Sequence, residues 1–193
     1  MAMYFTSDWH IGEKPAPNTP SFLRPEPTEV MAERWLAQCH QLLKPGDDLY
    51  FLGDLAVTPE SLNFYRRLPK GLLIFLVCGD KEANIKEELY ADGIYGGIFD
   101  NIYSRVSLTI GNTFWIAMHK PEDILDDCGD RPALCGHVHG IWRTQCMPNG
   151  QPIINVGIDA WGGLVSEEHI MHQYDAITKG YYDRNARVDL WKI

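Results

Sequence analysis

The sequence lacks the features that would direct the protein into or across a membrane. It contains no run of about 18 apolar residues, so no transmembrane helix is predicted. Residues 1–7 do not combine a basic stretch with a long apolar stretch, and no secretory signal is predicted. The five cysteines include no C-x-x-C pair, and an odd number does not suit a disulfide framework. We therefore expect reduced thiols, a cytoplasmic location and no membrane association.

An excess of basic residues is also lacking. Lys and Arg number 17 against 26 Asp and Glu, which gives a formal net charge of −9. Long duplex nucleic acid requires a basic surface and is not an expected partner. A small phosphorylated ligand stays compatible with this charge, because bound divalent cations can invert the local field. The length of 193 residues and the 45% hydrophobic content predict a single domain over 1–193; they do not predict an oligomeric state.

Apolar runs alternate with helical spacings in the first half of the chain. Strands are predicted at 3–7, 48–52 and 71–78, and helices at 28–43 (with Thr28 as N-cap) and at 59–68. This alternation predicts a parallel α/β core with right-handed crossovers. Between the first strand and the first helix, residues 12–27 hold five of the twelve prolines. They predict a loop that could form a lid or a substrate wall.

The second half has a different pattern. Two antiparallel strands, 103–110 and 113–118, are predicted to join at Gly111-Asn112, and a hairpin is predicted around Asn149-Gly150. Residues 157–163 predict a loop. The remaining predicted segments are short helices at 84–91 and 121–127, strands at 133–135, 141–145 and 152–156, and a helix at 166–177 capped by Ser166.

Acidic residues and histidines follow most of these apolar runs. Each signal is weak alone, since D-x-H also suits a turn, a lone histidine suits a core, and Gly-Asp occurs four times. Their positions after buried strands select them, because side chains converge at the strand ends of a sheet. Carboxylates and neutral imidazoles are ligands for transition metals. The candidates are Asp8, His10, Asp54, Asp80, His119, and the pair His137 and His139 in C-G-H-V-H-G.

Taken in order, the blocks D-W-H, G-D, G-D-K, H and G-H-V-H resemble the calcineurin-like metallophosphoesterases. The pattern of that family is D-x-H, G-D, G-N-H/D/C, H and G-H-x-H. The resemblance spans Asp8 to His139, and N-V-G-I-D at 155–159 is similar to short bacterial and phage members. It implies an α/β fold, a four-layer αββα sandwich of mixed sheets with helices on both outer faces. It also implies a binuclear-metal-dependent phosphoesterase in which a metal-bridging hydroxide attacks phosphorus.

The resemblance implies a ligand set for each of two divalent ions. Mixed carboxylate and imidazole ligands suit Mn, Fe, Ni or Zn better than Ca, and we expect Mn first. Asn155 and Asp159 are predicted either to support the site from a second layer or to stabilise a turn. Both sets share Asp54 as the bridging, catalytic carboxylate; they comprise Asp8, His10 and His139 for one ion and Asp80, His119 and His137 for the other.

The sequence departs from the family at Gly79-Asp80-Lys81. Most relatives have a neutral Asn where this chain has Asp80, and many have a proton-donating His where it has Lys81. The extra carboxylate would make the centre less attractive to a phosphate anion. We therefore hypothesise that Lys81 compensates Asp80 and serves as a catalytic or substrate-binding residue. Phosphate contact is the safer role, because a lysine with a pKa of about 10.4 is a poor acid. The alternative is an exposed Lys81 that points away from the site.

The missing His favours leaving groups that depart with little protonation. We therefore expect phosphodiesters of small or nucleotide-like substrates. A phosphomonoesterase of the same family is one alternative. The other is a non-catalytic metal-binding scaffold, since the retromer subunit of this fold resembles the family yet serves in protein assembly. Filled histidine positions weigh against the scaffold.

Overall fold

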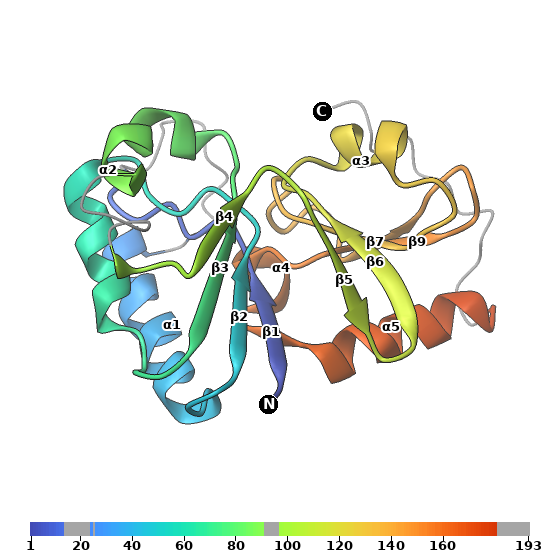
Figure 1. The fold of residues 1–193 in the computed structure, drawn as a ribbon, viewed down its shortest axis with the longest axis horizontal. Coiled ribbons are helices and arrows are strands. Elements are labelled where there is room, and N and C mark those ends of the chain that lie inside the picture. The colour runs from blue at the N-terminus through green and yellow to red at the C-terminus, as the bar shows by residue number, and fades with distance from the viewer. Residues whose placement is uncertain (14–23, 25, 91–96, 181–193) are drawn as a thin grey trace.

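The centre of the computed structural model, which describes residues 1–13, 24, 26–90 and 97–180, consists of two five-stranded β-sheets (Figure 1). The first sheet has the order β10-β1-β2-β3-β4 and the second the order β5-β6-β7-β9-β8. Strands β1, β2, β3 and β4 are parallel, as are β6, β7 and β9, while the edge strands β10, β5 and β8 are antiparallel. The strands are β1 (Met3–Thr6), β2 (Asp48–Phe51), β3 (Leu73–Val77), β4 (Asn101–Tyr103), β5 (Val106–Ile110), β6 (Thr113–Ala117), β7 (Ala133–Cys135), β8 (Thr144–Cys146), β9 (Pro152–Asn155) and β10 (Val165–Ser166).

Helices cover the outer face of each sheet. The face of the first sheet that packs on α1 (Thr28–Leu42) also receives the 3₁₀-helices η1 (Pro59–Arg67) and η2 (Lys81–Ile85) and the short α2 (Lys86–Tyr90). On the second sheet, Ile124 of α3 (Pro121–Asp127) packs against the outward side chains of β6, β7 and β9. The predicted four-layer αββα sandwich is confirmed. No helix in the described ranges is long and apolar enough to span a bilayer.

The layer between the sheets is an apolar core that both sheets share. Phe5 and Val77 of the first sheet and Trp115 and Leu134 of the second are fully buried there. Strand alternation produces this layer, because every second side chain points inward. The last helix, α5 (Glu167–Thr178), places Ile170 in the same core and so closes one side of the sandwich (Figure 1).

The segment predicted as one strand over 103–110 belongs to two sheets. Its beginning lies in β4, which pairs with β3, whereas 106–110 forms β5 at the edge of the second sheet. The chain crosses between the sheets at Ser104 and Arg105, which are both exposed. These two polar residues interrupt the alternation between Tyr103 and Val106, and so short an interruption does not by itself identify a change of sheet.

Several predicted boundaries are corrected. The helix expected at 59–68 is the 3₁₀-helix η1, and the loop expected at 157–163 contains the short α4 (Ile158–Trp161). The strand expected at 141–145 begins later, at Thr144, and forms β8. Thr28 is not an N-cap; Pro27 occupies that position and Thr28 is buried in the first turn. Ser166 does cap α5, because its hydroxyl accepts a hydrogen bond from the amide of His169. Most of the predicted lid loop, at 14–23 and 25, lies outside the described residues.

Truncating the inter-sheet core should destabilise the fold. Phe5→Ala removes a side chain with no exposure that stacks on Tyr50 at a centroid distance of 5.3 Å. We expect a loss of about 3–5 kcal/mol in the free energy of unfolding, measured by urea denaturation. Phe114→Ala on β6 is the control, since Phe114 is 70% exposed and should change stability by less than about 0.5 kcal/mol. Equal losses for the two variants would contradict the described packing.

Candidate metal centre

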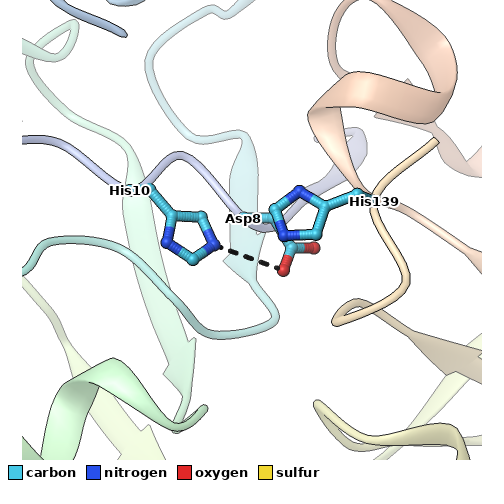
Figure 2. A group of neighbouring side chains, drawn as sticks. All are labelled: Asp8, His10 and His139. Carbon is cyan, nitrogen blue, oxygen red and sulfur yellow. Dashed lines mark ion pairs between the residues drawn. The ribbon is translucent and has the colours of Figure 1, made fainter. Parts of the chain in front are cut away.

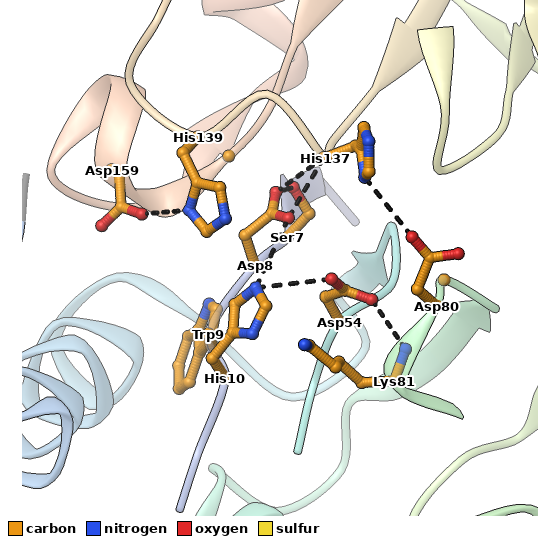
Figure 3. Close-up of polar contacts among 12 residues, drawn as sticks. Ser7, Asp8, Trp9, His10, Asp54, Asp80, Lys81, His137, His139 and Asp159 are labelled. Atoms are coloured by element: carbon orange, nitrogen blue, oxygen red, sulfur yellow. Dashed lines mark hydrogen bonds and ion pairs between the residues drawn. The ribbon is translucent and has the colours of Figure 1, made fainter. Parts of the chain in front are cut away.

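The parallel strands of both sheets deliver their following residues to one place. The first sheet contributes residues that follow β1, β2 and β3, and the second contributes residues that follow β6 and β7. All seven predicted candidates fall into three overlapping groups, in which the candidate ligand atoms lie within 4.8 Å of one another. The groups are Asp8, His10 and His139 (Figure 2); Asp80, His119 and His137; and Asp8, Asp54 and His119. Figure 3 shows how Asp8, Asp54, Asp80 and His137 lie in the last two groups.

Asp54 lies between a histidine of each sheet. Its Oδ2 is 3.4 Å from Nε2 of His10, and its Oδ1 is 3.5 Å from Nε2 of His119. Both of these ring nitrogens are buried and have no hydrogen-bond partner in the described structure. A carboxylate that presents one oxygen to each of two groups has the arrangement that a bridging ligand requires.

These inward spacings fit cations better than hydrogen bonds. Nδ1 of His137 lies 3.7 Å from Oδ2 of Asp80, which is also beyond ordinary hydrogen-bond range. Two ligands bound to one ion at about 2.1 Å are separated by roughly 3–3.5 Å, close to the spacings found here. Buried polar atoms that lack partners are otherwise costly. The clusters are therefore consistent with a metal site.

The outward nitrogens of three histidines, in contrast, are held at short distances. Metal-binding imidazoles usually have such an outer partner, which fixes the tautomer and the ring orientation. The pairs are Nδ1 of His10 with Oε2 of Glu13 at 2.5 Å, Nδ1 of His119 with the carbonyl of Leu52 at 2.6 Å, and Nδ1 of His139 with Oδ2 of Asp159 at 2.7 Å.

Asp159 and Asn155 both support the turn that carries His139. Asp159 also accepts hydrogen bonds from Nε and Nη2 of Arg24 at 3.0–3.2 Å, and Arg24 donates to the backbone carbonyl of Asp8 as well. Asn155 is fully buried, and its amide donates to the carbonyl of His139 at 2.7 Å. This is the placement that the second-layer prediction requires.

The backbone is strained at the site. In the described part of the chain, the non-glycine residues with positive φ are all candidate ligands. Left-handed conformations cost such residues free energy and persist only where the surroundings enforce them. The residues and their φ values are Asp8 (62°), His10 (50°), Asp54 (53°), His137 (71°) and His139 (47°).

Glycines allow the strand ends to approach each other this closely. A Cβ at Gly79 would lie 2.6 Å from Oδ1 of Asp54, and one at Gly136 would lie 2.4 Å from Oγ of Ser7 and 2.9 Å from Oδ2 of Asp8. None of these three distances is possible unless the neighbouring side chain moves. The glycines of the G-D and G-H motifs therefore let the turns pack against one another.

A buried carboxylate joins two of these turns. Glu82 accepts hydrogen bonds from the amides of Asp54 at 3.0 Å, Leu55 at 2.8 Å and Gly79 at 2.5 Å. Burial raises the pKa of Glu82, and the three amides act in the opposite direction. Glu82 thereby fixes the end of β2 to the end of β3, where the side chains of Asp54 and Asp80 begin.

Two lysines lie at the solvent side of the centre. The ammonium of Lys120 lies 2.7 Å from Oδ1 of Asp80, whereas that of Lys81 lies 3.3 Å from Oε1 of Glu13. The ammonium that contacts Asp80 is thus that of Lys120. The reason is topological, because Lys120 follows His119 at the end of β6 and faces the end of β3. The hypothesis that Lys81 compensates Asp80 by contacting a substrate phosphate stays a prediction.

The charges of the metal-free centre are balanced by protons. Burial alone would lower the pKa of His10, but Asp8 and Glu13 raise it to about 9. Burial opposes the charged form of His119 too, yet Asp54 and Asp8 raise its pKa to about 9. The ion pair with His10 lowers the pKa of Glu13 to about 2. Burial favours neutral Asp54, but His119 outweighs it and keeps that pKa well below its usual range.

Four contributing residues were not predicted from the sequence. Glu13 follows His10 by three residues, and this spacing is a usable signal for a histidine partner. The others carry no distinguishing signal, since each reads as an ordinary charged residue of a loop or helix end. They are Arg24, Glu82 and Lys120.

Comparison with protein-family models and with curated proteins gives no match. Solved structures do match. A protein of unknown function from Aquifex aeolicus, AQ665, is 23% identical with a TM-score of 0.63, over 89% of this chain and 98% of the other. An archaeal phosphodiesterase is 16% identical with a TM-score of 0.51, over 81% and 84%. Vps29 of Chaetomium thermophilum is 15% identical with a TM-score of 0.42, over 80% and 69%. The chain has the fold of the calcineurin-like metallophosphoesterases, as its motifs predicted.

Metal binding should release protons and strengthen with pH. Because His10 and His119 have pKa values of about 9, their imidazoles are protonated at neutral pH and an incoming cation must displace those protons. The apparent affinity for Mn²⁺ should therefore rise from pH 6.5 to pH 9 and then level off. Calorimetric titrations in buffers of different ionisation enthalpy measure the protons released. An affinity that does not change across this range would contradict the described charge balance.

Replacing the buried carboxylate that joins β2 and β3 should weaken both fold and centre. Glu82→Gln places an amide NH₂ among backbone N–H groups, and we expect a loss of about 1–3 kcal/mol in unfolding free energy. Urea denaturation of the metal-free protein measures the loss. The exposed Glu87, mutated to Gln, is the control. Equal stabilities for the two variants would show that the three hydrogen bonds contribute little.

Proposed function

We propose that this protein is a phosphoesterase that uses two divalent metal ions. The observation that carries the proposal is the position of Asp54 between His10 and His119, at ligand spacing from both. One cluster draws on residues that follow β1 and β7, and the other on residues that follow β3, β6 and β7. Nε2 of His10 and Nε2 of His119 are both buried without a hydrogen-bond partner, which a purely structural ion-pair cluster does not require.

The proposed ligands divide between two ions. Mixed oxygen and nitrogen donors favour Mn²⁺, with Fe, Ni and Zn as alternatives. Asn155 and Asp159 would hold His139 in its orientation. The first ion would take Asp8, His10 and His139, and the second Asp80, His119 and His137, with Asp54 shared.

Two such cations, when bound, would activate water as a nucleophile and stabilise the charge that develops on a phosphoryl group. The protein supplies position. Asp54 fixes the separation of the two ligand sets, and the strained turns aim their side chains before any ligand arrives. The outer partners Glu13 and Asp159 fix the orientation of the rings, so that the inward nitrogens of His10 and His139 face the centre.

Phosphodiesters are the proposed substrates. Neither Lys81 nor Lys120, the cations on the solvent side, is an efficient proton donor at neutral pH, so good leaving groups are favoured. Lys81 could contact a substrate phosphate while its ammonium also pairs with Glu13. An archaeal phosphodiesterase has the same fold, and this is compatible with the proposal. The net charge of −9 supports small or nucleotide-like substrates over long nucleic acid.

The five free cysteines fit the expected cytoplasmic location.

Metal-dependent hydrolysis of a diester tests the function. Metal-free protein supplemented with Mn²⁺ should hydrolyse bis-p-nitrophenyl phosphate faster than p-nitrophenyl phosphate, as measured by p-nitrophenolate release. Asp54→Ala should reduce turnover at least about 100-fold, because it removes the shared ligand. Asp126→Ala on α3 is the control, since Asp126 is exposed.

The other outcomes identify the alternatives. A strong preference for the monoester would replace the diesterase proposal with a phosphomonoesterase. Two bound metal ions without turnover of either ester would favour the non-catalytic scaffold. Protein that binds no Mn²⁺ would contradict the metal centre itself.

A further inference from the structure

Asp80 differs from the other carboxylates of the centre in exposure and in partner. Its side chain is 48% exposed, compared with 0% for Asp8 and 6% for Asp54. Its Oδ2 faces Nδ1 of His137 at 3.7 Å, while its Oδ1 lies 2.7 Å from the ammonium of Lys120. One oxygen is therefore directed at the cluster and the other is occupied by a cation.

The position of Lys120 is set by the same strand that carries a candidate ligand. Lys120 follows His119 directly, and its side chain is 34% exposed at the solvent side of the centre. Within the described ranges, Lys120 is the lysine whose side chain forms an ion pair with one of the three aspartates. The ammonium of Lys81 is engaged by Glu13 instead.

We propose that Lys120 determines the anion affinity of the centre by offsetting the charge of Asp80. This inference rests on the proposed function. Under the proposed function, a phosphate group would reach the centre from its solvent side, where Asp80 is exposed, and an uncompensated carboxylate would repel it there. The ammonium at Oδ1 reduces this repulsion and leaves Oδ2 available toward His137. The Coulomb interaction between two charges is strong when they are close together and partly shielded from water.

The proposal requires changes of opposite sign. Removing the ammonium makes the second ligand set more negative, so Mn²⁺ should bind more tightly and phosphate more weakly. A lysine with only a structural role would weaken both interactions when removed. A solvated lysine would change neither. The pair of signs therefore separates the charge effect from a positioning effect.

Lys120→Met and Lys120→Arg provide the test, with Lys179→Met as the matched control. Lys179 also forms an exposed ion pair, with Asp175 at 2.6 Å at the end of α5. Calorimetry measures Mn²⁺ binding to metal-free protein and inorganic phosphate binding to the Mn²⁺-loaded protein. In Lys120→Met, the weaker Mn²⁺ site should tighten about 3- to 10-fold and phosphate should weaken about 3- to 10-fold. Lys120→Arg and the control should stay within about twofold of wild type.

A charge-matched double variant completes the design. Asp80→Asn combined with Lys120→Met has the same net charge as wild type, so it should regain most of the phosphate affinity lost in Lys120→Met. No recovery, or a Lys120→Met protein that binds both ions as wild type does or binds both more weakly, would overturn the role of Lys120. Those results leave the proposed function intact, because they presuppose Mn²⁺ binding. Wild-type protein that binds no Mn²⁺ would overturn both.

Discussion

Burial of negative charge is the constraint on which the rest of the centre depends. Asp8 and Asp54 lie almost wholly out of water, and a buried carboxylate without a partner is too costly to persist. Protons on His10 and His119 supply the balance in the metal-free protein, and divalent cations would replace them. Asp80 and Glu13 are more exposed, and the ammonium groups of Lys120 and Lys81 lie beside them. The charge of the site is thus a property of the whole cluster and does not belong to one residue.

The geometry of the centre depends first on the conformation of the backbone, which determines where the side chains lie. The turns after β1, β2 and β7 hold non-glycine residues in the left-handed region, and small residues beside them let the turns touch. Glu82 ties the turn after β2 to the turn after β3 through three amide hydrogen bonds. The large sheets on either side resist relaxation of this strain, because their shared core is close-packed. Preorganisation of this kind is costly to folding and useful for binding.

The order of the motifs predicted the fold and the grouping of seven residues at one site. Both predictions depend on the residues that come directly after each apolar run. Residues that act from outside the strand ends were harder to foresee. Arg24 and Glu82 are ordinary charged residues in sequence, and only the tertiary structure places them beside a ligand turn. Local periodicity also did not separate β4 from β5, since Ser104 and Arg105 interrupt the alternation for two residues only. The ion pair of Asp80 with Lys120 was likewise not predicted, because the two residues follow strands of different sheets.

The division of the candidate ligands between two sheets has a consequence for assembly of the protein. The aspartates and His10 come from strands of the first sheet, whereas the other histidines come from the second. Neither sheet alone supplies all the candidate ligands for either ion. A chain in which only one sheet has formed would therefore offer an ion an incomplete binding site. A bound cation would therefore stabilise the protein only after both sheets have formed and packed together, because binding free energy is added only to the state that binds.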